Sequence, residues 1–222
     1  MDMDVNWTEF LTPVWLSIKI SVITSIIVFI LAVAAAKAMA NRRFRGKSLV
    51  ETVLLLPLVL PPTVVGFVLL VLLGRRSWIG RLYEQLTEQT IIFTWVAAVI
   101  ASVIVAFPLV YRTVKSGFES VERNLEDAAR AQGASEFQVL RYVSLPLASR
   151  SLAAGYVLGF ARGLGEFGAT IMVAGNIPGR TQTVPTAIYV AVDGGNMVLA
   201  WMLVCSIIAI SAVMLMFVNR NS

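Results

Sequence analysis

Residues 13–39 read PVWLSIKISVITSIIVFILAVAAAKAM, an almost unbroken apolar run. A helix needs about 20 predominantly apolar residues to cross the roughly 30 Å hydrocarbon core of a bilayer. The run is long enough to do so, and it predicts an integral membrane protein. The composition agrees, because 58% of the 222 residues are hydrophobic and 14% are charged, whereas soluble domains average about 45–50% apolar and 25% charged residues.

Four further apolar runs follow the first. They cover residues 49–73, 91–111, 147–173 and 196–218. Together the five runs predict an all-α polytopic protein with five transmembrane helices. Glycines at positions 155, 159 and 163 recur every four residues and predict close packing of the fourth helix against a neighbour. No repeat or flexible linker divides the chain, so we expect residues 1–222 to form a single transmembrane domain.

Positive charges in the connecting loops predict the orientation. Arg42, Arg43, Arg45 and Lys47 lie between the first and second runs, and the long loop after the third run is also basic. Loops rich in Lys and Arg usually face the cytoplasm. Five helices with these two loops inside place the N-terminus outside and the C-terminus inside, although the arginines from Arg75 onward weaken the asymmetry.

Several kinds of chemistry lack the residues they need. The sequence has no histidine, which removes Ser/His hydrolase sites and HExxH zinc sites, and we expect no catalytic or metal centre. It has no GxxxxGK[ST] phosphate loop, so any ATP hydrolysis requires another chain. The eighteen Lys and Arg residues are scattered between apolar runs. That distribution is typical of topology signals, and we expect no nucleic-acid partner.

The loop of residues 117–146 is polar but strongly patterned. Val121 and Leu125 recur at helical spacing with charges between them, which predicts a short amphipathic helix over residues 119–131. Gly133 follows at the position of a left-handed C-cap. The first half of the loop is therefore predicted to be a helix that ends in a sharp turn.

A second short helix is predicted over residues 135–142. Ser135 precedes Gln138 by three residues, which is the spacing of a capping box. Pro146 suits the first turn of the next helix, because its missing N–H would be unpaired there anyway. The loop therefore predicts a helix, a turn and a second helix that leads into a membrane span.

The spacing of six residues in this loop resembles the EAA loop of bacterial ABC importer permeases. These residues are Asp127, Ala128, Ala129, Gly133, Leu145 and Pro146. Asp127 stands where the family pattern has Glu. The resemblance implies coupling helices that dock in a groove of a separate ATPase subunit, which would bind ATP and Mg, whereas this chain would bind no cofactor. An amphipathic hairpin lying on the membrane surface is the alternative.

Three further segments are similar to the molybdate permease subfamily: PLVLPPTVVG at 57–66, ARGLGEFGAT at 161–170 and GNIPGRTQT at 175–183. The resemblance implies a type I ABC importer permease that moves molybdate or tungstate across a bacterial or archaeal cytoplasmic membrane. It also implies a homodimer, surrounded by membrane lipid, and an extracytoplasmic oxyanion-binding protein. A sulfate or other oxyanion permease is the alternative within the class, and an ion-coupled secondary transporter is the alternative from another class.

Five residues are candidates for the translocation pathway or gate. They are Pro61, Pro62, Arg162, Glu166 and Thr170. The prolines break or kink the second helix, and freed carbonyls are tolerated only against protein or a water-filled cavity. Arg162 and Glu166 share a helix face at a depth where an unpaired charge costs at least about 2.5–3.5 kcal/mol. They form either a mutual ion pair or a site beside the path of an anion.

Overall fold

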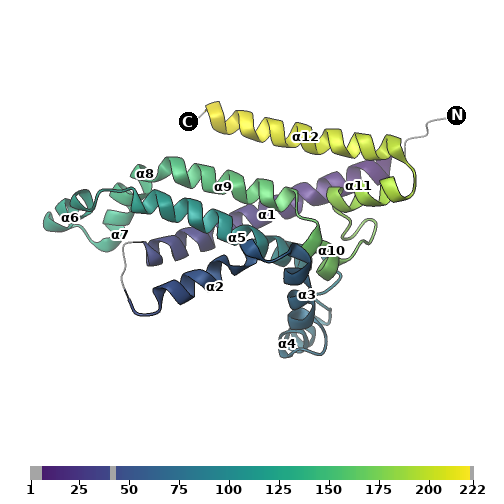
Figure 1. Cartoon of the computed structure of the whole chain (residues 1–222), viewed down its shortest axis with the longest axis horizontal. Helices are drawn as coiled ribbons and strands as arrows, with labels where there is room; N and C mark the ends of the chain where they lie inside the picture. Colours follow the sequence, from purple (N-terminus) through teal and green to yellow (C-terminus); the bar gives the residue numbers. More distant parts are fainter. Residues whose placement is uncertain (1–6, 41–43, 221–222) are drawn as a thin grey trace.

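The computed structural model describes residues 7–40 and 44–220, and it is entirely helical in its regular structure there. Arg42 and Arg43, used above to predict the orientation, lie outside the described residues. Three helices are each long and apolar enough to span a membrane: α1 (Trp7–Met39), α5 (Trp95–Glu119) and α12 (Met197–Arg220). They run along the long axis of the molecule (Figure 1) and contain the first, third and fifth predicted runs, apart from the starts of the third and the fifth.

The second and fourth runs are each divided into two helices. α2 (Lys47–Val59) and α3 (Pro62–Leu73) are bent by 111°, and α9 (Ser149–Leu164) and α10 (Gly168–Ala174) by 57°. The described chain has up to five spans if each bent pair counts as one. Neither run is the continuous helix that its hydropathy alone suggests.

The two breaks have different causes. Pro61 and Pro62 end α2 and start α3, because proline lacks the N–H that would continue the helix and fits the first helical turn. Pro57 lies inside α2 and does not end it. In the fourth run the chain leaves the helix at Gly165, and α10 begins only at Gly168. Glycine at both positions weakens helical continuity.

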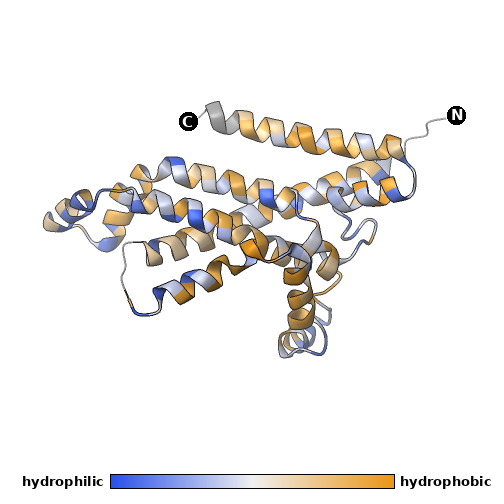
Figure 2. Cartoon of the chain, in the orientation of Figure 1, coloured by the Kyte–Doolittle hydropathy of each residue, from blue (hydrophilic) through white to orange (hydrophobic). Residues whose placement is uncertain are grey.

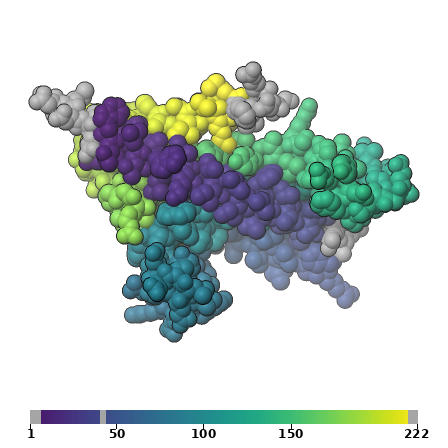
Figure 3. Space-filling model, turned by 180° about the vertical axis from the view of Figure 1, so that it is seen from behind, coloured from purple at the N-terminus to yellow at the C-terminus, as the bar shows by residue number. Residues whose placement is uncertain are grey.

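The centre of the molecule is a bundle of α1, α5 and α9, which pack side by side. The glycines of the fourth run allow the close helix packing that was predicted for them. A Cβ atom on Gly155 would lie 2.8 Å from a methyl group of Val114, and one on Gly163 would lie 3.3 Å from a methyl group of Thr24. α1 crosses the face seen in Figure 3. The small side chains on its buried face allow this close approach: Ser17, Ser21, Ser25, Ala32 and Ala36.

The remaining elements surround this bundle. α2 packs on α5 and has no buried side chain, but Glu51 is joined to Lys115 by an ion pair of 2.6 Å. α3 and α4 (Trp78–Thr87) project from the bundle, and α3 is strongly apolar (Figure 2). α11 (Val184–Asp193) packs beside α12, and its first amide donates a 2.7 Å hydrogen bond to Ser17 Oγ.

Candidate functional site

Residues 117–146 form a helical hairpin at one end of the bundle (Figure 1). The first arm is α6 (Arg123–Ala131) and the second begins with α7 (Glu136–Val139). The second arm continues through a π-helical turn, η1 (Leu140–Ser144), into α8 (Leu145–Leu147). The two predicted short helices are therefore present, with the first starting four residues later than expected. We call residues 117–146 the hairpin.

Gly133 makes the turn between the two arms. Its φ is +87°, in the left-handed region that glycine adopts without steric penalty. The Gly133 amide donates to the Arg130 carbonyl at 2.9 Å and the Ala134 amide to the Ala129 carbonyl at 3.1 Å. This pair of bonds is a Schellman motif, and it satisfies carbonyls that the end of α6 would otherwise leave unpaired.

The predicted capping box at the start of the second arm is confirmed. The Gln138 amide donates to Ser135 Oγ at 3.3 Å, and the Ser135 amide donates to Gln138 Oε1 at 2.8 Å. Both bonds satisfy backbone donors that the first turn of α7 cannot pair internally. The turn and the start of the second arm are therefore determined by local sequence.

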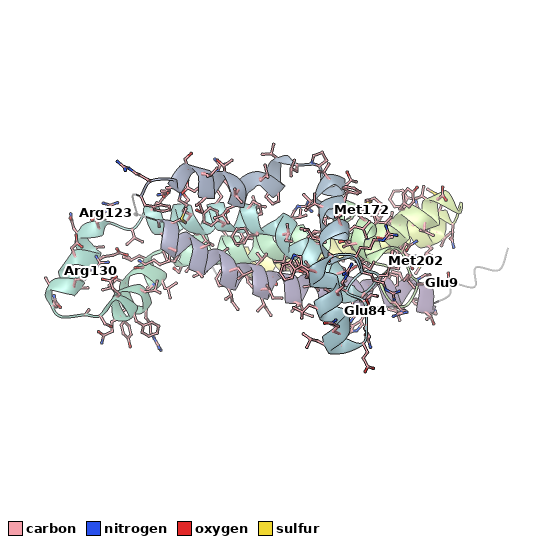
Figure 4. All side chains as sticks on the ribbon, turned by 90° about the horizontal axis from the view of Figure 1, so that it is seen from below. Glu9, Glu84, Arg123, Arg130, Met172 and Met202 are labelled. Carbon is pink, nitrogen blue, oxygen red and sulfur yellow. The ribbon has the colours of Figure 1, made fainter. Side chains whose placement is uncertain are left out.

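Arg130 ties the two arms together at their outer end, where Figure 4 shows its side chain. Its Nε lies 2.7 Å from Glu136 Oε1 on the second arm, and its Nη1 lies 2.8 Å from Asp127 Oδ1 on the first. The hydrogen bond with Glu136 raises the pKa of Arg130 above its ordinary value and lowers the pKa of the Glu136 carboxyl. The charge-assisted hydrogen bond between Arg130 and Glu136 therefore links the two arms at the surface of the hairpin.

Glu126 joins the hairpin to the bundle. Its side chain is only 9% exposed, and its Oε1 accepts hydrogen bonds from Lys37 Nζ at 2.9 Å and from Ser144 Oγ at 2.5 Å. Lys37 is in the last turn of α1, and its Nζ also lies 3.1 Å from Ser144 Oγ. Burial alone would raise the pKa of Glu126, but these hydrogen bonds and the nearby positive charges lower it. Three elements, α1, α6 and η1, therefore meet at one carboxylate.

Sequence reasoning missed this cluster because its members are far apart in the chain. Lys37 and Glu126 are 89 residues apart. One signal was available: Lys37 is a charged residue near the end of an otherwise apolar run. Such a charge needs a partner or access to water, but nothing local in the sequence indicates which carboxylate provides it.

The six residues that resemble the EAA loop are spread along the hairpin, from the first arm and the turn to α8 at the base of the second arm. Asp127, Ala128, Gly133 and Pro146 are exposed, whereas Ala129 and Leu145 are half-buried. Phe137 and Tyr142 on the second arm are 68% and 69% exposed. Small residues beside exposed aromatic side chains give a surface suited to close contact with a protein partner.

The two broken helices meet at α3 and α10. A Cβ on Gly66 would lie 2.7 Å from Met172 Cβ and 2.9 Å from Ala169 Cα, so the two helices touch through backbone at this point. At the start of both helices, a Cβ on Gly168 would lie 3.0 Å from Pro62 Cβ. The structure therefore brings Pro62 next to the segment that contains Thr170, although Pro61 and Pro62 are both largely exposed.

Arg162 and Glu166 form the mutual ion pair, one of the two arrangements expected. Arg162 Nη1 lies 2.6 Å from Glu166 Oε2, and Glu166 Oε1 accepts a 2.8 Å hydrogen bond from the Ala169 amide near the start of α10. The Glu166 side chain is 1% exposed and that of Arg162 is 30% exposed. Thr170 is buried, and its hydroxyl has no hydrogen-bond partner among the described residues. The pair thus fixes the break between α9 and α10.

A helical bundle with three apolar helices of spanning length, two broken spans and a charged hairpin at one end is the architecture of a multi-pass membrane protein. Residues 28–221 match the family described as binding-protein-dependent transport system inner membrane component, and the chain belongs to this family. Members of the family are transport components and not catalytic subunits. The resemblance noted in the sequence is confirmed at the level of the family.

Three relatives indicate where in the family the chain lies. It is 51% identical to YvgM of Bacillus subtilis, which is assigned to a molybdenum transport system as its permease, over 98% of this chain and 96% of YvgM. It is 45% identical to the molybdenum transport system permease protein ModB of Haemophilus influenzae, over 78% of this chain and 76% of ModB. It is 41% identical to the sulfate transport system permease protein CysW of Synechococcus elongatus, over 68% of this chain and 53% of CysW.

Solved structures of ABC transporters share the fold. One is a bacterial alginate transporter in complex with its substrate-bound periplasmic protein, with a TM-score of 0.76 and 14% identity over 96% of this chain and 77% of that chain. Another is the methionine transporter MetNI in an inward-facing conformation, with a TM-score of 0.72 and 15% identity over 100% of this chain and 97% of that chain. The expected type I ABC importer permease fold is confirmed.

Proposed function

We propose that this chain is the permease subunit of an ATP-driven importer that carries molybdate, or the similar tungstate ion, across a bacterial or archaeal cytoplasmic membrane. The observation that carries the proposal is the similarity to permeases of molybdenum transport, which extends over almost the whole chain. The ATPase would be a separate polypeptide, because this sequence has no phosphate-binding loop.

The hairpin is the proposed contact with the ATPase. Its arms are held together by Arg130, and Glu126 joins it to Lys37 of α1. A rigid element with exposed aromatic side chains at its tip is suited to transmit a displacement of a bound partner to the membrane helices. Closure of the ATPase on ATP would move the hairpin, and the hairpin would move α1 and α9.

The remaining partners follow from the orientation and the exposed surfaces. With the hairpin in the cytoplasm, the N-terminus faces outside and an extracytoplasmic binding protein delivers the oxyanion there. We expect two copies of this chain, one for each ATPase subunit. The exposed apolar surfaces of α2, α3 and α12 supply the area that lipid and a second copy would cover.

A sulfate importer is the second candidate, and the similarity to CysW favours it. Molybdate and sulfate are both tetrahedral dianions, so a pathway that accepts one has the charge and geometry to accept the other. Selectivity between them would then depend on the binding protein.

Uptake of labelled molybdate into proteoliposomes tests the proposal. The vesicles contain this chain, its cognate ATPase and the binding protein, with ATP present or absent. We expect ATP-dependent uptake that excess tungstate suppresses and excess sulfate does not. Suppression by sulfate would favour the second candidate, and uptake that survives without ATP but collapses with an uncoupler would show a secondary transporter instead.

A further inference from the structure

A pocket lies at the end of the bundle opposite the hairpin, where α1, the start of α5, the end of α4 and the loop before α11 meet. It encloses about 370 Å³. Its lining residues include Thr12, Trp15, Lys19, Tyr83, Gln89, Thr94, Trp95 and Arg180. We call it the Lys19 pocket. Lys19 and Arg180 supply positive charge, and none of the lining residues is an Asp or Glu.

Lys19 is an unusual charge for its position. It lies 12 residues from the first residue of α1, which is about 18 Å along the helix at 1.5 Å per residue. It has no carboxylate partner among the described residues, and its Nζ instead lies 3.9 Å from the centre of the Trp95 ring. A charged side chain within a transmembrane helix is costly and generally marks a functional site.

Arg180 reaches the pocket from a loop that is itself fixed. The Arg180 amide donates to the Ile177 carbonyl at 3.0 Å, and the Ile177 amide donates to Thr181 Oγ1 at 3.0 Å. Thr181 is fully buried, so the turn is anchored in the protein. Arg180 has no ion-pair partner in the described part of the chain. Lys19 and the exposed Arg180, which come from distant segments, therefore line one cavity, and neither is paired with a carboxylate among the described residues.

We infer that the Lys19 pocket binds a tetrahedral oxyanion. Lys19 and Arg180 supply the opposite charge, and Tyr83, Gln89 and the Trp95 indole add N–H and O–H donors of the kind that oxyanions accept. The enclosed volume exceeds that of one such ion, which leaves room for part of its hydration shell.

The role we assign to this pocket rests on the proposed function. If the hairpin is cytoplasmic, the Lys19 pocket faces outside, where the binding protein would release its cargo. The pocket would then be the first site on the permease to receive the ion. It is distinct from Arg162, whose charge is already paired with Glu166.

Titration of molybdate into the permease–ATPase complex in nanodiscs, without the binding protein, tests the site directly. We expect wild-type complex to bind molybdate, and Lys19→Gln or Arg180→Gln to weaken binding about tenfold or more, as for the loss of one hydrogen bond to a charged group. Arg81→Gln is the matched control, because it removes a charge from α4 outside the pocket, and it should leave binding unchanged.

Two further variants separate loss of the site from loss of the fold. Lys19→Arg and Arg180→Lys keep the charges and should bind within a fewfold of wild type. Absence of binding to wild type, or equal weakening by Arg81→Gln, would overturn the inference. Because this titration needs neither ATP nor transport, binding without uptake would count against the proposed function alone, and uptake without binding would count against the pocket alone.

Discussion

At the residue scale, the cluster of Lys37, Glu126 and Ser144 carries the account of coupling. A carboxylate that is 9% exposed is stable only when charge and hydrogen bonds compensate its burial. Here the charge comes from Lys37 on α1 and a hydrogen bond comes from Ser144 in η1. A displacement of α6 therefore either moves the end of α1 or breaks a partly buried ion pair. The cluster makes the hairpin part of the bundle and not an appended loop.

Replacement of one partner tests this role. Lys37→Met removes the nearer of the two cations at Glu126, leaves Arg130 Nη2 at 3.5 Å from the carboxylate, and should lower the free energy of unfolding by about 1–3 kcal/mol. We expect reduced molybdate uptake per ATP hydrolysed, because the hairpin would move without α1. Thermal unfolding of the purified complex and the ratio of uptake to hydrolysis in proteoliposomes measure the two effects.

The double variant Lys37→Met/Glu126→Met provides the control. It removes both charges, so it should regain much of the stability lost in the single variant, as seen when buried ion pairs are replaced by apolar residues of similar size. If uptake per ATP is unchanged in both variants, the cluster is structural only.

At the element scale, the two broken spans determine where the membrane helices touch. α3 and α10 approach each other so closely that Gly66 leaves no space for a Cβ atom against Met172 and Ala169. Both helices begin directly after a break, and Glu166 holds the second break through the Ala169 amide. A contact between two short helices at their breaks is suited to act as a gate, because either helix can shift without distorting a long span.

Gly66→Val tests the contact between α3 and α10. Its side chain would collide with the α10 backbone, and such overpacking typically costs about 1–3 kcal/mol. We expect a lower unfolding temperature of the purified complex and slower uptake. Val71→Ile is the matched control, because it adds volume to an exposed side chain of α3 and should be tolerated. Equal stability of both variants would show that α3 can move away from α10 at no cost.

Features that depend on neighbouring residues, such as turns, caps and helix breaks, were predictable from the sequence. Features that depend on contacts between distant segments were not. The positive φ of Gly133, the capping box of Ser135 and Gln138, and the break at Pro62 depend on neighbouring residues, and each was predicted. The bend angles were not predictable, because they depend on packing between helices. For the same reason, the spacing of Arg162 and Glu166 permitted an ion pair but could not show that it forms.

At the scale of the whole molecule, the chain has two chemically different ends. One end carries the hairpin, with carboxylates, arginine and exposed aromatic side chains, and the other carries the Lys19 pocket, with cations and no lining carboxylate. α1 connects them, since Lys19 lies at the pocket and Lys37 at the hairpin. This arrangement is what an importer needs if the anion enters at one end and an ATPase acts at the other.

The most direct test of the central claim, that the hairpin is the cytoplasmic docking surface of the ATPase, is accessibility of the hairpin to a membrane-impermeant maleimide. In a Cys205→Ser background, the exposed Tyr142 is replaced by Cys on the hairpin, and the exposed Trp78 is replaced by Cys on α4 as the control. We predict that Tyr142→Cys is labelled only from the cytoplasmic face and is protected when the ATPase binds, whereas Trp78→Cys is labelled from outside with or without the ATPase. Labelling of Tyr142→Cys from outside, or labelling that the ATPase does not slow, would contradict the account.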